Sequence, residues 1–302
     1  MNYKHLLYSI VLLFFVGACT SEQKPVEGPT TLDTSQLVED LRVLSSDEME
    51  GRRTGTEGNR KAREYLVERF KQVGAEPFKG EYTHPFTFEN RSGEKLEAVN
   101  VIGQINGQTD SVIVITAHYD HLGVRDSLIF NGTDDDASGT AVLLAYADYF
   151  NKEEPNHTLV FAAFDAEEMG LKGARAFVED SVLLERVVLN INLDMISQND
   201  KGELYASGTY HHPELKPVLE SIETGDVQLL FGHDRPEQGY DDWTSASDHG
   251  AFHAKGKKFI YFGVEDHEHY HKATDDFDTI PLDFYKSSAQ VILNAILAFD
   301  ER

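Results

Sequence analysis

Short apolar runs with few polar residues inside them recur along the chain. They differ from the alternating pattern of a half-exposed strand and are typical of strands that are buried on both faces of a sheet. We therefore expect buried strands at residues 99–105, 112–116, 158–164, 187–193 and 259–264.

Between these runs, apolar residues recur every three or four positions, which is the spacing of a helix with one buried face. The spacing predicts helices at residues 34–44, 58–73, 138–150, 168–177 and 282–299. Thr34 or Ser35 is the expected cap of the first helix. Alternating strands and helices predict an α/β fold with three layers, α/β/α, around a mixed, mostly parallel central sheet. In such a sheet the functional side chains gather beyond the carboxyl ends of the strands.

The N-terminal segment has a different pattern, because residues 6–16 are almost wholly apolar and follow a short, weakly basic start. This run has the length of a signal-peptide core and is too short to cross a bilayer. It closes at Cys19 and resembles a bacterial lipoprotein signal, in which the cysteine is lipidated after cleavage. An ordinary secretory signal with an incidental cysteine is the alternative.

The expected organisation is a signal peptide at 1–18, a lipidated Cys19 with a flexible tether over 19–33, and a single catalytic domain at 34–302. The protein would then be exported and lipid-anchored to a bacterial cell membrane, on its periplasmic or surface face.

Composition narrows the classes of partner and of site. The 302 residues include 52 acidic and 27 basic ones, and the formal net charge of −25 argues against nucleic acid or an anionic lipid surface as a partner. A hydrophobic content of 40% indicates a globular protein. Since Cys19 is the only cysteine, an internal disulfide framework and a cysteine-based zinc site are both excluded.

Acidic and histidine residues cluster where the predicted strands end. Each cluster alone has an ordinary explanation, such as capping of a helix or a solvated turn. Together they would crowd carboxylates on one rim, where they repel one another unless a cation neutralises them. Histidine beside aspartate and glutamate suits zinc or another borderline divalent ion. The clusters lie at residues 116–121, 131–139, 164–170, 192–195 and 266–275.

These clusters carry a family resemblance. The motifs are His118-Tyr119-Asp120, Asp134-Asp135-Asp136-Ala137-Ser138-Gly139, Ala166-Glu167-Glu168-Met169-Gly170, Asn192-Leu193-Asp194-Met195, Ser247-Asp248-His249 and Tyr270-His271, preceded by a glycine- and arginine-rich block at 51–59. In this order they resemble the co-catalytic zinc metallopeptidase family that includes bacterial leucyl-type aminopeptidases and glutamate carboxypeptidases. The resemblance covers roughly residues 35–300 and implies the fold of a zinc peptidase.

The resemblance also implies a ligand set for two Zn²⁺ ions, with Co²⁺ or Mn²⁺ as possible substitutes. By motif position, His118 and Asp194 would hold one ion, and Glu168 and His271 the other. Asp135 would bridge the two ions, because it stands four residues before Gly139 as the bridging carboxylate of the family does.

Further roles follow from the same comparison. Glu167 would be the general base, and Asp120 would orient His118. Asp248 would contact the substrate or support the structure, and Tyr240 or Trp243 would bound the pocket or donate a hydrogen bond to the oxyanion.

Four further acidic and histidine residues in these clusters are interpreted without a catalytic or metal-binding role. Asp134 and Asp136 are interpreted as helix-end caps. His267 and His269 are interpreted as exposed loop residues, with a further metal or substrate contact as the alternative.

The predicted activity is that of a zinc-dependent aminopeptidase, which hydrolyses N-terminal residues from peptide substrates through a metal-bridged water. Carboxypeptidase or dipeptidase activity is disfavoured, because Arg175 and Arg235 look isolated and no arginine cluster stands near the motifs. The alternatives are a glutaminyl-peptide cyclotransferase, which would use one zinc on the same fold, and a non-catalytic binding domain. The second is disfavoured because every catalytic position is occupied.

Overall fold

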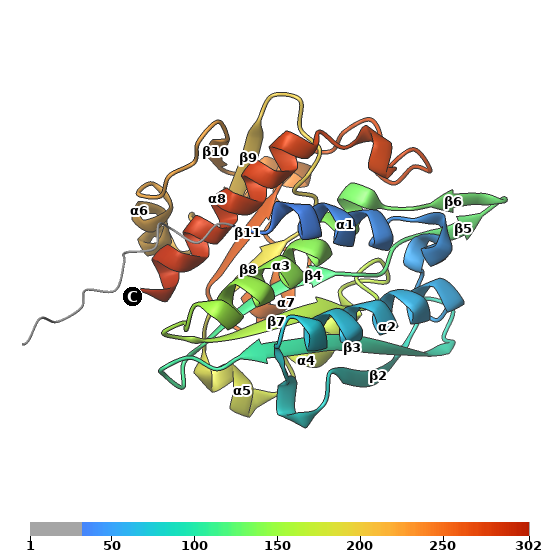
Figure 1. Ribbon diagram of the computed structural model, residues 1–302, viewed down its shortest axis with the longest axis horizontal. Helices are drawn as coiled ribbons and strands as arrows, with labels where there is room; N and C mark the ends of the chain where they lie inside the picture. Colours follow the sequence, from blue (N-terminus) through green and yellow to red (C-terminus); the bar gives the residue numbers. More distant parts are fainter. Residues whose placement is uncertain (1–31, 302) are drawn as a thin grey trace, which may run out of the picture. The chain divides into compact units, whose positions relative to one another are not determined.

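A nine-stranded mixed sheet lies at the centre of the computed structural model, which describes residues 32–301 (Figure 1). The strand order is β1-β3-β7-β4-β8-β11-β9-β10, and β2 pairs with β3. The strands are β1 (Glu76–Pro77), β2 (Thr83–Glu89), β3 (Lys95–Ile105), β4 (Val112–His118), β7 (Thr158–Phe164), β8 (Val187–Leu193), β9 (Glu203–Ser207), β10 (Gln228–Phe231) and β11 (Phe259–Gly263). A separate hairpin joins β5 (Gly123–Arg125) to β6 (Leu128–Phe130).

The middle of the sheet is parallel. Strands β7, β4, β8 and β11 are parallel neighbours, so their carboxyl ends share one edge. Strand β3 runs antiparallel to β7, and β9 runs antiparallel to β11. The predicted mixed sheet is therefore confirmed, and β7 and β8 have the predicted bounds. Strand β2 was not predicted, because it alternates exposed and half-buried positions instead of forming an apolar run.

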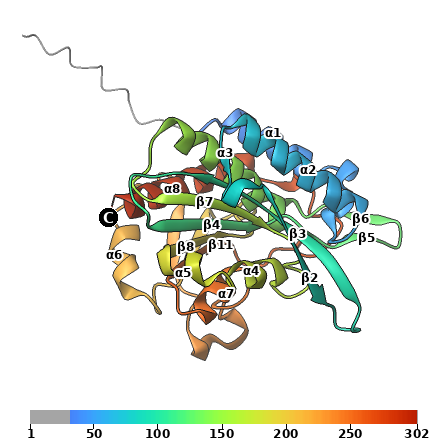
Figure 2. The same ribbon diagram turned by 90° about the horizontal axis from the view of Figure 1, so that it is seen from below.

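Helices cover both faces of the sheet (Figure 2). Helices α1, α2, α3 and α8 lie on one face, and α4, α5 and α7 lie on the other. The larger hydrophobic core fills the first interface, and a smaller core around Phe177 and Phe252 fills the second. The helices are α1 (Thr34–Leu44), α2 (Glu57–Gln72), α3 (Gly139–Lys152), α4 (Lys172–Phe177), α5 (Ser181–Arg186), α6 (Lys216–Leu219), α7 (His249–Ala254) and α8 (Leu282–Asp300).

The cap of α1 and the first residue of α4 differ from the prediction, and α2 and α3 begin within one residue of their predicted starts. Asp33, not Thr34 or Ser35, caps α1, because its carboxylate accepts hydrogen bonds from the backbone N–H groups of Ser35 and Gln36, both at 3.1 Å. Helix α4 begins at Lys172, not at 168. Gly170 and Leu171 have φ angles of +98° and +58°, which a right-handed helix does not allow.

Contacts divide the chain into two units, Met1–Thr30 and Thr31–Arg302, and the structure described here is that of the second. The predicted signal peptide at 1–18, Cys19 and most of the tether lie outside the described residues. Among residues 32–301, no helix combines the length and the apolar character needed to cross a membrane.

One buried side chain joins segments at the edge of the sheet where the parallel strands β4, β7, β8 and β11 end (the catalytic edge). Arg52 lies in the glycine- and arginine-rich block, and its side chain is fully buried. Its guanidinium donates to the carbonyl oxygens of Leu44 and Tyr119 at 2.7 and 2.8 Å, and to those of Asn131 and Gly132 at 2.5 and 2.8 Å. Arg52 therefore fastens the end of α1, the loop after β4 and the turn before α3 to one another.

We predict that Arg52→Met destabilises the protein by at least about 3 kcal/mol, because it leaves several buried carbonyl groups without a donor. Arg186→Met is the matched control, since within residues 32–301 exposed Arg186 donates to only one carbonyl, that of Asp110. Urea unfolding of both variants measures the difference. Equal losses of stability would refute the role assigned to Arg52.

Candidate metal centre and active site

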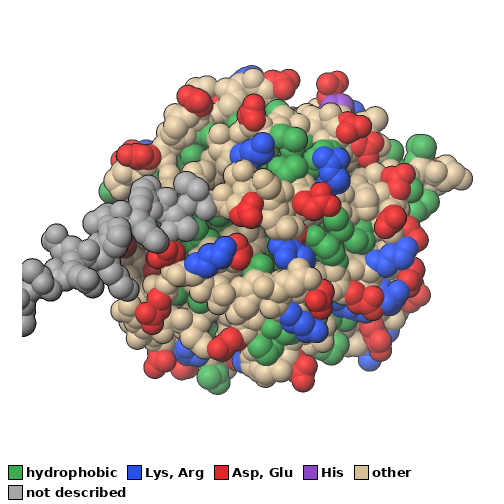
Figure 3. Space-filling view, in the orientation of Figure 1, with side chains coloured by type: hydrophobic (Ala, Val, Ile, Leu, Met, Phe, Trp, Pro, Cys, Tyr) green, Lys and Arg blue, Asp and Glu red, His purple; other side chains and the backbone are tan. Residues whose placement is uncertain are grey.

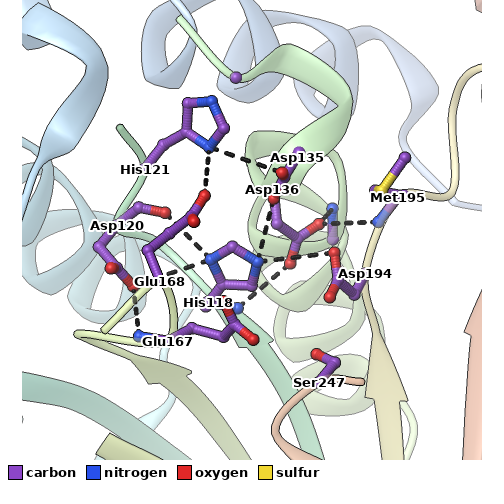
Figure 4. Close-up of polar contacts among 12 residues, drawn as sticks. His118, Asp120, His121, Asp135, Asp136, Glu167, Glu168, Asp194, Met195 and Ser247 are labelled. Carbon is purple, nitrogen blue, oxygen red and sulfur yellow. Dashed lines mark hydrogen bonds and ion pairs between the residues drawn. The ribbon is translucent and has the colours of Figure 1, made fainter. Parts of the chain in front are cut away.

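The first potential ligand group lies where β4 and β8 end. His118 is the last residue of β4, and Asp194 directly follows β8. The Nε2 atom of His118 lies 3.2 Å from Asp135 Oδ1 and 3.5 Å from Asp194 Oδ1 (Figure 4). These three side chains are buried, and their ligand atoms are close enough to share one metal ion.

A second group uses the other oxygen of the same aspartate. His121 Nδ1 lies 2.9 Å from Glu168 Oε1 and 3.7 Å from Asp135 Oδ2, and these three residues could also hold a metal. His271 reaches the same place from the loop after β11, with its Nε2 atom 3.1 Å from Asp135 Oδ2 and 3.6 Å from Glu168 Oε1. Asp135 therefore stands between the two groups, as its predicted bridging role requires.

The donor atoms fit a cation better than they fit one another. His121 Nδ1, Glu168 Oε1 and Asp194 Oδ1 are buried, and none has a hydrogen-bond partner within residues 32–301. His121 and Glu168 approach to 2.9 Å, but their orientation is not that of a hydrogen bond. Buried polar atoms without partners are costly, and a divalent ion bound by imidazole and carboxylate would satisfy them.

His121 is the candidate ligand that motif comparison missed. It directly follows Asp120 in the loop after β4, and that adjacency was the only local signal for it. The side chain is directed by packing against Gly132, where a Cβ atom would come within 2.4 Å of the His121 ring. With φ at +56°, Gly132 combines close approach with a backbone conformation that favours glycine.

Asp120 supports the site through two connections. Its backbone carbonyl lies 3.0 Å from His118 Nδ1, and its carboxylate is 3.7 Å away. That carboxylate accepts the backbone N–H of Glu167 at 2.9 Å and the hydroxyl of Thr54 at 3.2 Å. The residue predicted to orient His118 thus contacts it through its carbonyl oxygen, while its carboxylate contacts the backbone of Glu167.

The interpretation of Asp136 as a helix cap is confirmed. Its Oδ1 accepts the backbone N–H of Gly139 at 2.9 Å, at the start of α3. Its Oδ2 accepts the backbone N–H of His118 at 3.1 Å, so the same side chain also ties α3 to the end of β4.

The interpretation of Asp134 as a cap is wrong. Asp134 Oδ1 accepts the N–H and hydroxyl of Ser197, both at 2.7 Å, and Oδ2 lies 3.0 Å from His267 Nε2. His267 is accordingly not an exposed loop residue, since its side chain is only 13% exposed. These contacts join the turn before α3 to the loops after β8 and β11. Asp275 reinforces this junction by accepting the backbone N–H groups of Asp134 and Asp135.

Glu167, the predicted general base, lines the cavity beside His118. Burial raises the pKa of its carboxyl well above the usual range, with further contributions from Asp248 and Asp194 and an opposing one from His118. For Asp135 burial acts in the same direction. However, the three nearby histidines, His121, His118 and His271, outweigh it and hold the pKa of Asp135 well below its usual value. The pKa values of these two carboxyls are thus shifted in opposite directions by their surroundings.

Of the two residues predicted to contact the substrate, Tyr240 lines a cavity at the site and Asp248 does not. A cavity of about 540 Å³ opens over the ligand groups and is lined by Tyr240, Trp243, Tyr261 and Tyr270, among others. Tyr240 is fully exposed at its mouth. Asp248 is not among the lining residues; it is buried without a hydrogen-bond partner in the described structure, and burial and Asp194 raise its pKa to about 7.

Arginines gather at the same cavity, in contrast to the expectation that Arg175 is isolated. Arg175 and Arg91 both line it. A neighbouring cavity of about 780 Å³ is lined by Arg91 again, with Arg53 and Lys172. Arg91 lies in the turn between β2 and β3, so the prediction missed this grouping because it depends on an unpredicted strand pair.

The sequence is similar to those of known peptidases. Residues 100–296 match the profile of peptidase family M28. Aminopeptidase YwaD of Bacillus subtilis is 29% identical over 220 residues, which are 69% of this chain and 45% of YwaD. The chain spans less than half the length of the curated relatives it matches.

Two solved structures show the same fold. A zinc aminopeptidase from Bacillus subtilis matches with a TM-score of 0.70 and 16% identity, covering 87% of this chain and 94% of that one. Glutaminyl cyclase from Fimbriiglobus ruber matches with a TM-score of 0.71 and 19% identity, covering 91% and 98%. The fold is therefore shared by enzymes of both predicted classes.

The shared carboxylate provides a test of the ligand groups. Because Asp135 belongs to both groups, we predict that Asp135→Asn lowers the zinc content per chain by roughly half or more, and by more than His121→Ala, which affects one group. Zinc is measured by mass spectrometry after dialysis at fixed free zinc. Asp283→Asn on the exposed face of α8 is the control. An Asp135→Asn protein with unchanged zinc content would contradict the bridging role.

Proposed function

The chain belongs to peptidase family M28, and from this premise we propose that it is a zinc aminopeptidase that removes N-terminal residues from peptides. The observation that carries the proposal is the pair of ligand groups that share Asp135. A single carboxylate between two such groups suits two zinc ions, one held by His118 and Asp194 and the other by Glu168, His271 and His121. Zinc bound there would polarise the scissile carbonyl and lower the pKa of a water molecule.

Glu167 is the group that moves the proton. It lines the cavity, and its backbone N–H is held by Asp120, so its position relative to His118 is set. Its carboxylate would take a proton from the attacking water and then deliver it to the leaving amine. Burial and neighbouring acids raise its pKa, which makes the carboxylate a stronger base than an exposed glutamate.

The floor of the cavity suits a substrate with a free amino terminus. Glu167, Glu168 and Asp194 line it, and all three are buried or half-buried. Carboxylates in a partly water-excluded cavity attract an ammonium group more strongly than they would in bulk water. This arrangement supports aminopeptidase activity over an activity that needs a blocked amino terminus.

Glutaminyl cyclisation is the second candidate, favoured by the fold match to the Fimbriiglobus ruber enzyme. It would use one zinc, held by Asp135, Glu168 and His271, with Glu167 as the proton shuttle. The group of His118, Asp135 and Asp194 would then have no metal to hold, although Asp194 Oδ1 is buried without a hydrogen-bond partner in the described residues. That second group favours the peptidase. A binding domain without catalysis is disfavoured by Glu167 itself, because an inactive site has no use for a half-buried base among the ligands.

We predict that Glu167→Gln lowers kcat for aminoacyl reporter substrates by roughly 100-fold to 10,000-fold, because it removes the general base but no metal ligand. The zinc content should stay at the wild-type level. Glu185→Gln, on the exposed side of α5, is the matched control and should keep full activity.

The same assay separates the two candidate reactions. Peptides with N-terminal glutamine release glutamine if the enzyme is a peptidase and ammonia if it is a cyclase. Full activity of Glu167→Gln would eliminate Glu167 as the base.

We also propose that residues 34–302 form a single catalytic domain, exported behind the 1–18 signal and held by lipid on Cys19 to a bacterial membrane. The support is the apolar run that closes at Cys19 and the polar tether that follows it.

In a bacterial host, we predict that Cys19→Ser moves the protein from the membrane fraction to the soluble fraction, detected by immunoblot. Retention of the variant in membranes washed with high salt would exclude lipidation as the anchor.

A further inference from the structure

We propose that the mouth of the active-site cavity holds a carboxylate of the substrate between Arg91 and Arg175, so that the enzyme favours peptides with a negative charge near the scissile bond. The carboxylate could be the carboxyl terminus of a short peptide or an acidic side chain. The inference rests on the proposed function, because it concerns the substrate of that same site.

The first support is the position of Arg91. Strand β3 pairs with β7 so that Val101 lies opposite Ala163, and β7 ends at Phe164. Residues 95–99 and the turn that precedes them therefore extend past the catalytic edge of the sheet. Asn90 Oδ1 closes this turn by accepting the backbone N–H groups of Ser92 and Glu94, both at 3.0 Å. The turn places Arg91 over the cavity that contains the ligand groups.

The second support is convergence from separate segments. Arg175 comes from α4, which follows the Glu167–Glu168 loop, and lines the same cavity as Arg91. Arg53 and Lys172 line the adjoining cavity, which shares both Arg91 and Glu168 with the first. Cations from the 51–59 block, the β2–β3 turn and α4 thus line two cavities that share Arg91 and Glu168.

The third support is the absence of partners. On the face that carries α1, α2 and α8, several basic side chains lie beside acidic ones (Figure 3). Within residues 32–301, by contrast, no carboxylate lies within 4.0 Å of the charged groups of Arg53, Arg91, Lys172 or Arg175. Glu89 and Glu94, the acids that flank Arg91 in the sequence, line only the outer cavity, whereas Glu168 lines both.

The charge pattern suits one kind of ligand. A net charge of −25 repels anions at a distance, so unpaired cations at this opening serve binding more than long-range attraction. The buried or half-buried Glu167, Glu168 and Asp194 form the floor of the cavity, and the exposed Arg91, Arg175 and Asp266 lie at its rim. A peptide with its ammonium group at the floor would place a carboxylate at the rim, and arginine binds carboxylates through paired N–H donors.

The test uses the zinc-loaded full chain and three matched pairs of peptides. Leu-Gly-Gly against its C-terminal amide tests the carboxyl terminus. Leu-Glu-amide against Leu-Gln-amide tests a second acidic residue, and Glu-Gly-amide against Gln-Gly-amide tests a first one. The readout is the ratio of kcat/KM for the charged peptide to that for the neutral one.

We expect wild type to favour the charged member of at least one pair, and Arg91→Gln and Arg175→Gln each to lower that ratio by roughly threefold to tenfold. Arg125→Gln is the control, since Arg125 lies over the Phe130 ring and lines neither cavity; its ratio should match wild type. Ratios within twofold of wild type in both Arg91→Gln and Arg175→Gln, for every pair, would overturn the inference while leaving the aminopeptidase intact. Failure of the wild type to hydrolyse any of these peptides would overturn the proposed function and the inference with it.

Discussion

The buried guanidinium of Arg52 is the contact on which the catalytic edge depends. It donates to carbonyl oxygens of segments that are distant in sequence, the end of α1, the loop after β4 and the turn before α3. The loop after β4 carries His121, and the turn carries Asp135. Burial lowers the pKa of Arg52, while Asp136, Asp135, Asp275 and Asp120 raise it, so the cation also offsets part of the charge that the site concentrates. One side chain thus sets the loop geometry and moderates its electrostatics.

Around this contact the site is built in two layers of carboxylates. The outer carboxylates, such as Asp120, Asp136 and Asp275, accept backbone N–H groups and so position the segments that carry the ligands. The inner ones, Glu168 and Asp194, have buried oxygens that no described donor satisfies. This division explains how so many acids can share one edge. The outer layer is stabilised by the protein itself, and the inner layer needs cations to complete it.

The opening of the cavity adds the opposite charge. Arg91 and Arg175 face a site whose floor is acidic, so the two ends of a short peptide would meet groups of opposite sign. The β2–β3 turn and helix α4 supply these groups, and the ends of the parallel strands with the loops that follow them supply the ligands. A rigid sheet edge with variable segments above it can keep one chemistry and change its substrate.

The sequence by itself determined the buried strands, most helices and the set of motif residues that converge, because each depends on local periodicity or on a short motif. Residues 158–164 and 187–193 form strands with the predicted bounds, since apolar runs of this kind can only be buried in a covered sheet. Only the tertiary structure decided the places of His121, Asp134 and Arg91. His121 is directed by packing on Gly132, Asp134 by Ser197 and His267, and Arg91 by the register of β3 against β7. Each of these placements depends on a contact between segments that are far apart in the chain. A local sequence pattern does not predict which distant segments will meet.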